Sequence, residues 1–452
     1  MEEISKQLNQ YFKNYFNSFD QIYEDVDPKN LLSHNRIDVV AKIIYCEYFL
    51  KITPTKFNRL FYYIHLKKWN NFKANDSLKN CFYDYESEFK KTILSIKSQG
   101  FDKNKSIIPI DGYNKIIDGS HRLGASIVLN KKIRTARFLV NSPAVTIKKF
   151  INDFNLKNIN IIDYLIFNFI KYNNSLRIFT LFPVRDKKFD EQCFSIIKKY
   201  GEILITKSMK IGNLINGFNI CRTLYSGSEW LGNVDNKYKG AMWKAKNCFY
   251  NSDGVLDVIL FSPNKKENAT TANLKKLKEE IRKIYKIHFH SIHSSDNHIE
   301  TIRYSKIFFH SNTQELLPKR KGIFYDNFEQ NIENLNSSNI DSSQFVFSGS
   351  AVMAALGLRN PKDLDAFHSE NFILPKSVSS HNSQIKYLKY KLNELIFNPK
   401  NYFFYMGFKF LHPKVLLKLK ENRNTIKNNT KDNEDIKILK LFLSNQENSN
   451  IK

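Results

Sequence analysis

Two small residues and two carboxylates near the C-terminus have types and a spacing suited to phosphoryl transfer. Gly349 and Ser350 end a hydrophobic run, and Asp363 and Asp365 follow soon after. A glycine–serine turn lets backbone N–H groups and a small hydroxyl approach phosphate oxygens. Alternation along a strand puts Asp363 and Asp365 on one face, where they can hold Mg²⁺ against a triphosphate. We therefore predict that both aspartates are catalytic metal ligands and that Gly349 and Ser350 bind the nucleotide.

The segment from residue 345 to residue 367 resembles the DNA-polymerase-β-like nucleotidyltransferase superfamily. That superfamily has a hydrophobic residue, Gly, Gly or Ser, a short helix, and then Asp-x-Asp or Asp-x-Glu. The resemblance implies Mg²⁺ and a nucleoside triphosphate, ATP or CTP, as cofactors. The plainer alternative is a turn, a helix over 351–357 and a solvated Lys-Asp pair, because short motifs also occur by chance.

This sequence departs from the superfamily in one respect. Such enzymes usually carry a third carboxylate on a later strand, and the predicted strands over 402–411 have none. Glu370, Asp432 or Asp435 then supplies it, or the domain binds a nucleotide or a sugar without transferring a group.

A second motif, Asp118-Gly119-Ser120-His121-Arg122, lies far upstream. We expect a helix over 86–100 ended by Gly100, because glycine adopts the backbone conformation of a helix C-cap. A strand ending at Ile110, a hairpin, a strand over 115–117 and the motif at the start of a helix follow in order.

This order resembles the ParB/sulfiredoxin-like fold, in which the Asp-Gly-x-His-Arg turn opens a helix and holds nucleotide phosphates. The resemblance implies phosphate binding by Asp118, Gly119, Ser120, His121 and Arg122, with the arginine as a bidentate clamp. Sulfiredoxins have Cys at the position of Ser120, so sulfinic-acid repair does not fit. No helix-turn-helix pattern follows residue 140, although ParB partition proteins have one. The alternative is a plain turn with a solvated arginine.

Five of the eleven histidines lie between His288 and His310, with Asp296 and Glu300 among them. We expect a strand at 288–290 that puts two imidazoles on one face. A metal site, a phosphohistidine and general acid–base catalysis are all chemically open, and we take His293 as the candidate catalytic group. If His290, His293 and His298 do not converge, they are structural histidines.

The composition bounds the remaining interpretations. The chain has 452 residues, 42% of them apolar, and a formal net charge of +26. Its lysines are spread along the whole length, so a nucleic-acid partner is possible but not favoured. The five cysteines are dispersed without metal-type spacing, as expected of reduced thiols in a cytoplasmic protein. The longest apolar stretch, 159–169, is interrupted by polar residues, so we predict no membrane span.

We predict an α+β multidomain protein. Residues 1–150 hold a helical segment followed by the ParB/sulfiredoxin-like domain. The helical segment covers residues 1–75 and has an aromatic stripe at Tyr11, Tyr15 and Phe16. Residues 175–335 form a histidine-rich α+β domain, in which a helix between two strands suggests a ferredoxin-like layer. Residues 340–443 form the nucleotidyltransferase-like domain.

Three functions are compatible with these features. The first is a Mg²⁺-dependent nucleotidyl- or phosphotransferase that acts on a nucleotide and a small-molecule or sugar-phosphate substrate. The combination of motifs resembles proteins of bacterial surface-polysaccharide clusters, which implies capsule or lipopolysaccharide biosynthesis. The second is a ParB-like nucleic-acid-binding protein or nuclease. The third is a scaffold that senses nucleotides without turnover.

Overall fold

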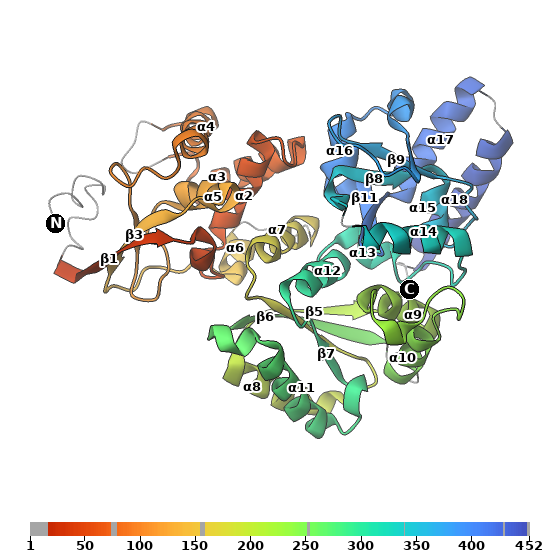
Figure 1. The fold of residues 1–452 in the computed structure, drawn as a ribbon, viewed down its shortest axis with the longest axis horizontal. Helices are drawn as coiled ribbons and strands as arrows, with labels where there is room; N and C mark the ends of the chain where they lie inside the picture. Colours follow the sequence, from red (N-terminus) through yellow and green to blue (C-terminus); the bar gives the residue numbers. More distant parts are fainter. Residues whose placement is uncertain are drawn as a thin grey trace. The chain divides into compact units, whose positions relative to one another are not determined.

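The protein is mixed α+β and divides into two compact units, Met1–Asn174 and Ser175–Lys452 (Figure 1). The structure is a computed structural model and describes residues 17–73, 79–153, 159–250, 254–338, 340–427 and 430–449. The predicted α+β multidomain class is confirmed at this level. The finer boundaries, at 150, 175, 335 and 340, stay predictions.

The N-terminal unit has a three-stranded sheet in the order β1-β3-β2. β3 (Ile133–Phe138) pairs antiparallel with β1 (Phe19–Val26) and parallel with β2 (Ile108–Ile110). An aromatic core formed around Tyr45, Tyr62 and Phe89 packs α2, α3, α4 and α5 together. The helices are α2 (Asp38–Phe49), α3 (Lys56–Asn70), α4 (Phe82–Gln99), α5 (Ser120–Leu129), α6 (Ile147–Asp153) and α7 (Ile159–Tyr172).

The helix predicted over 86–100 is confirmed as α4, with Gly100 at a φ of 78° as its C-cap. The helix-like prediction for 1–75 is wrong at β1. The apolar residues of β1 have helical spacing. Two register shifts against β3 interrupt the alternation of side chains between the two faces of the strand, as β-bulges do. Tyr11, Tyr15 and Phe16 lie outside the described residues. The strand predicted over 115–117 is reduced to one bridge, between Ile110 and Ile116.

The first part of the second unit has an antiparallel sheet in the order β5-β6-β4-β7. Its strands are β4 (Arg177–Leu181), β5 (Gly201–Lys210), β6 (Val255–Pro263) and β7 (Ile292–Ser294). Helices α8 (Asp190–Tyr200) and α11 (Thr271–Tyr285) share a hydrophobic core with the sheet, built on residues such as Phe179, Ile197 and Leu277. Between β5 and β6 the chain inserts α9 (Leu214–Leu224), the 3-10 helix η4 (Glu229–Leu231) and α10 (Lys239–Phe249).

The strand expected at 288–290 is wrong, because these residues form the 3-10 helix η6 (His288–His290). Lys286 and His288 both have positive φ, at 56° and 49°, and this backbone cannot continue a strand. Two helices, α12 (His298–Phe308) and α13 (Ser311–Leu316), follow β7.

The second part of this unit has a mixed five-stranded sheet in the order β10-β9-β8-β12-β11. The strands are β8 (Phe345–Ser348), β9 (Leu364–His368), β10 (Val378–Ser380), β11 (Tyr402–Tyr405) and β12 (Phe408–Leu411). α15 (Gly349–Ala355) connects β8 to β9, which pair antiparallel. The other helices are α14 (Asp326–Ser337), α16 (Leu392–Phe397), α17 (Pro413–Lys427) and α18 (Thr430–Ser449).

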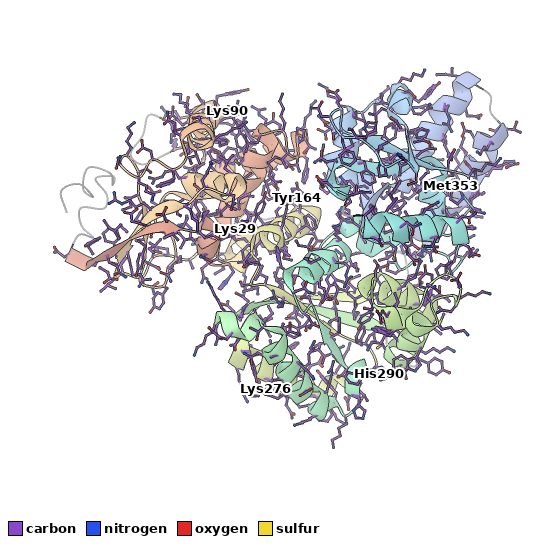
Figure 2. All side chains as sticks on the ribbon, in the orientation of Figure 1. Lys29, Lys90, Tyr164, Lys276, His290 and Met353 are labelled. Carbon is purple, nitrogen blue, oxygen red and sulfur yellow. The ribbon has the colours of Figure 1, made fainter. Side chains whose placement is uncertain are left out.

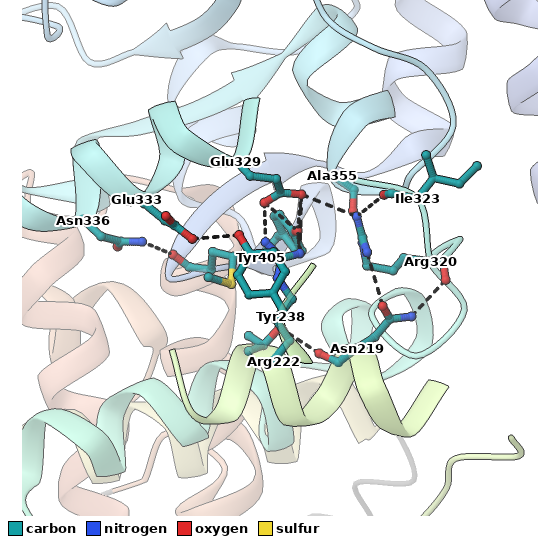
Figure 3. A network of polar contacts seen from close by, with 12 residues as sticks. Asn219, Arg222, Tyr238, Arg320, Ile323, Glu329, Glu333, Asn336, Ala355 and Tyr405 are labelled. Atoms are coloured by element: carbon teal, nitrogen blue, oxygen red, sulfur yellow. Dashed lines mark hydrogen bonds and ion pairs between the residues drawn. The ribbon is translucent and has the colours of Figure 1, made fainter. Parts of the chain in front are cut away.

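A buried polar network joins the two parts of this unit (Figure 3). Arg222 on α9 pairs with Glu329 on α14, and Arg320 lies 3.7 Å from the same carboxylate. The Tyr405 hydroxyl on β11 donates to Glu329 at 2.9 Å. Arg320 Nε also donates to the Ala355 carbonyl at the end of α15, at 3.0 Å. The network therefore anchors the helix that follows the glycine–serine turn.

The thiols are distributed as expected from the sequence. The lysines labelled in Figure 2 lie on η2 (Pro28–Leu31), α4 and α11. All five cysteines are free thiols, and only Cys81 is exposed. Within the described residues, none of the helices is long and apolar enough to span a membrane.

Candidate functional site

The glycine–serine turn lies directly against Asp365. Ser348, the last residue of β8, pairs with Asp365 on β9. Gly349 then turns the chain into α15 with a φ of 60°, a conformation that favours glycine. A Cβ added to Gly349 would come 2.9 Å from Oδ2 of Asp365, too close for an undistorted contact. Glycine is therefore needed here both for the turn and for the approach of backbone to carboxylate.

The two predicted metal ligands come together on β9. Asp363 is exposed just before the strand, and Asp365 is half-buried within it. Burial and the neighbouring Asp363 charge raise the pKa of Asp365 to about 6, while more distant cations lower it. This is the response of two close carboxylates that share a partly desolvated site. With this pKa, Asp365 is mostly ionised at neutral pH.

His381, which follows β10, is a site neighbour that the sequence analysis missed. Its Nε2 lies 3.8 Å from Oδ2 of Asp365. Its Nδ1 is buried and has no hydrogen-bond partner among the described residues. Burial, together with the charges of Arg423 and Lys420, lowers its pKa to about 4, so the imidazole is neutral at pH 7. No spacing in the sequence connects this histidine with the Asp-x-Asp motif, because β10 brings it there.

Two of the three candidates for a third carboxylate, Asp432 and Asp435, are already paired. Asp432 accepts from Arg423 at 2.6 and 2.7 Å and lies 3.2 Å from Lys420 Nζ. Asp435 lies 2.6 Å from the same lysine and also pairs with Arg359. Both side chains are 1% exposed. Glu370 is exposed beyond the end of β9. In the described part of the chain, no group of three or more His, Cys, Asp or Glu side chains is placed to hold a metal ion.

The upstream motif forms the predicted turn and helix start. Gly119 has a φ of 86° and precedes Ser120, the first residue of α5. The Arg122 guanidinium folds back over this glycine, since a Cβ there would come 3.1 Å from Nη2. Nη1 donates to the Ser106 hydroxyl at 2.6 Å, and Nη2 lies 3.6 Å from Asp118. The ion pair is loose, and 27% of the arginine side chain remains exposed.

A pocket of about 210 Å³ opens beside this turn. His121 forms part of its wall, and its Nε2 lies 2.8 Å from the Tyr62 hydroxyl. Burial holds the pKa of His121 well below its usual value, so the ring is neutral. The motif thus surrounds an accessible pocket rather than a closed ion pair. The pocket is lined by Lys79, Tyr85, Glu88, Phe89, Thr92, Asp118, Gly119, Ser120, His121 and Arg122.

The histidines of the middle region have separate partners. His293 Nε2 lies 2.6 Å from the Tyr304 hydroxyl, and its ring contacts Tyr225 with centroids 4.6 Å apart. His290 packs against Trp243 instead, at 5.2 Å between centroids. Burial holds the pKa of His293 well below its usual value. A catalytic role for His293 stays a prediction.

Comparisons with known proteins give no relative. No protein-family model matches the chain, and no curated protein or solved structure matches it either. The site must therefore be interpreted from its own geometry.

Proposed function

We propose that the protein is a Mg²⁺-dependent nucleotidyl- or phosphotransferase. The observation that carries this proposal is the contact between the Gly349 turn and Asp365, with Asp363 alongside. A phosphate bound at the turn would lie next to a carboxylate pair that needs a cation. Carboxylate oxygens are suitable ligands for Mg²⁺, so the residues present fit the metal.

In the proposed reaction, Asp363 and Asp365 hold the metal, and Gly349 and Ser350 hold the triphosphate of ATP or CTP. Bound Mg²⁺ would neutralise the negative charge of the phosphates. The protein contributes mainly position and electrostatics, as is general for phosphoryl transfer. Lys420, Lys431 and Arg423 lie close enough to lower the pKa of Asp365, so they also add positive potential to the site.

Strand topology supports the three proposed domain types without a sequence relative. The order β5-β6-β4-β7, with a helix after β4 and another after β6, is the order of a ferredoxin-like layer. The β8–turn–α15–β9 unit fits the polymerase-β-like signature, and the turn before α5 fits the ParB/sulfiredoxin-like motif. Fold does not fix function, so the sites carry the proposal.

The N-terminal pocket would hold a second phosphate-bearing ligand. Lys79 and Arg122 supply positive charge, and Gly119 lets the Arg122 guanidinium lie close to the backbone at the start of α5. A sugar phosphate fits this role, and surface-polysaccharide synthesis is the proposed setting.

Isothermal titration calorimetry with ATP or CTP, with and without Mg²⁺, tests the nucleotide site. We expect Mg²⁺-dependent binding that Asp363→Ala and Asp365→Asn abolish, while circular dichroism shows an intact fold. Glu434→Gln, an exposed change on α18, serves as the matched control. Equal affinity in the two aspartate variants and in the control would refute the assignment.

A nucleotide-sensing scaffold is the second candidate function. It is favoured by the ion pairs of Asp432 and Asp435, which leave the site with two carboxylates. Nucleotide consumption by the purified protein separates the candidates, because a sensor binds without turnover. A nucleic-acid-binding protein would instead show affinity that falls steeply with salt.

A further inference from the structure

The C-terminal unit contains a pocket of about 400 Å³, and its chemistry is unlike that of either phosphate site. Its walls come from the loop between α9 and α10, from α14 and from Met406 in the β11–β12 turn. A volume of this size is typical of small-molecule sites. We propose that this pocket binds a neutral, hydroxyl-rich ligand, a saccharide or a related polyol.

The charge of the lining argues against an anion. The chain has 70 Lys and Arg against 44 Asp and Glu, yet Lys, Arg and His are absent from the residues that line the pocket. Its charged members are Glu229 and Glu333. Two carboxylates without a cation in the wall repel phosphate. The ligand is therefore not a second nucleotide or a sugar phosphate.

The polar atoms that remain available include several acceptors. Glu333 uses Oε1 to accept from the Tyr238 hydroxyl at 2.7 Å, which leaves Oε2 for a ligand (Figure 3). The Asn336 amide nitrogen donates to the Met406 carbonyl at 3.0 Å, which leaves the amide oxygen. Among the described residues, the Glu229 carboxylate and the Ser228 hydroxyl have no hydrogen-bond partner. Several acceptors and a serine hydroxyl match a ligand that presents several O–H donors.

The loop of the pocket is closed by its own side chains. Gly227 and Gly232 both have a φ of 85°, and a Cβ at Gly232 would come 2.3 Å from Oδ1 of Asn236. The Asn236 side chain closes the turn by accepting from the Asn233 N–H at 3.1 Å. A loop held in one conformation lowers the entropy that a ligand must remove on binding.

Binding to the whole protein, without nucleotide or Mg²⁺, tests the inference. Calorimetry and saturation-transfer NMR would use glucose, galactose, N-acetylglucosamine and sucrose, with inorganic phosphate and spermidine as charged comparisons. We expect saturable millimolar binding of at least one saccharide. Affinity should fall about tenfold in Glu333→Gln, which replaces an acceptor oxygen with an NH₂ donor, and in Ser228→Ala, which removes the hydroxyl.

Glu315→Gln, an exposed change on α13, is the matched control and should bind like the wild type. If Glu333→Gln fails to fold, Glu229→Gln and Ser228→Ala carry the test. The inference is overturned if no saccharide binds, if the pocket variants bind like the control, or if spermidine or phosphate binds there more tightly. The inference does not rest on the proposed transferase function, and neither nucleotide nor Mg²⁺ enters the assay.

Discussion

Glu329→Gln should destabilise the C-terminal unit strongly. The side chains of Arg222, Arg320 and Glu329 are each 1% exposed, and the single carboxylate lies between two guanidinium groups. Glutamine has nearly the same shape but no charge, and its NH₂ group faces other donors. The change leaves two positive charges buried without a counter-charge.

Removing one partner of a buried ion pair costs about 3–5 kcal/mol. For a unit as long as residues 175–452, each 1 kcal/mol lowers Tm by about 2 °C. We therefore expect a Tm loss of roughly 6–10 °C in differential scanning calorimetry. The transition of the N-terminal unit, which contains none of these residues, should not move.

Glu333→Gln is the matched control, one helical turn further along α14. Glu333 accepts one hydrogen bond, from Tyr238, so its change should cost about 1 kcal/mol or less. The double variant Arg222→Met/Glu329→Gln should cost less than the sum of the single variants, since the two residues are coupled. A Glu329→Gln variant as stable as the control, or additive costs in the double variant, would refute the reasoning.

Three further predictions concern Asp365, His310 and Arg122. Asp365→Asn should stabilise the ligand-free protein by up to roughly 3 kcal/mol at pH 8, because the raised pKa of about 6 means that ionisation of Asp365 destabilises the folded state. This gain in stability should vanish below about pH 4. A lower melting temperature of the variant at pH 8 would contradict the prediction. Burial lowers the pKa of His310 to about 3, so protonation of this residue should lower stability as pH drops below 6.5, by roughly 2 kcal/mol at pH 5. His310→Phe should weaken this dependence of stability on pH in urea titrations. An unchanged dependence would count against the prediction. Arg122→Ala should abolish inorganic phosphate binding to the N-terminal pocket in calorimetry, with Arg59→Ala as the control. Equal phosphate affinity in both variants would refute the proposed phosphate site.

Local signals predicted several elements around the candidate sites, where these signals agreed with the final packing. Gly100 ends α4, Gly119 opens α5, and the hydrophobic run at residue 345 forms β8, because glycine punctuation and apolar runs act over a few residues. The pairing of Ser348 with Asp365 was not predicted, because strand register depends on how β8 and β9 pack together.

Other features depend on contacts that no local pattern carries. In β1, Phe19, Ile22, Tyr23 and Val26 have helical spacing, and pairing with β3 overrides it. His381 reaches Asp365 only because β10 pairs with β9. The network around Glu329 and the pocket at Ser228 each combine segments about a hundred residues apart or more, so neither could be predicted from spacing.

The network also has a consequence for synthesis of the chain on the ribosome. Arg222 and its partner Tyr405 are 183 residues apart in sequence. At 5–20 residues per second, about 10–40 s separate the appearance of the arginine from that of the tyrosine. During this interval the α9 surface that Arg222 later buries must stay solvated or covered. Nascent chains stalled before residue 405 should therefore bind chaperones or aggregate, whereas those extended beyond α17 should resist protease.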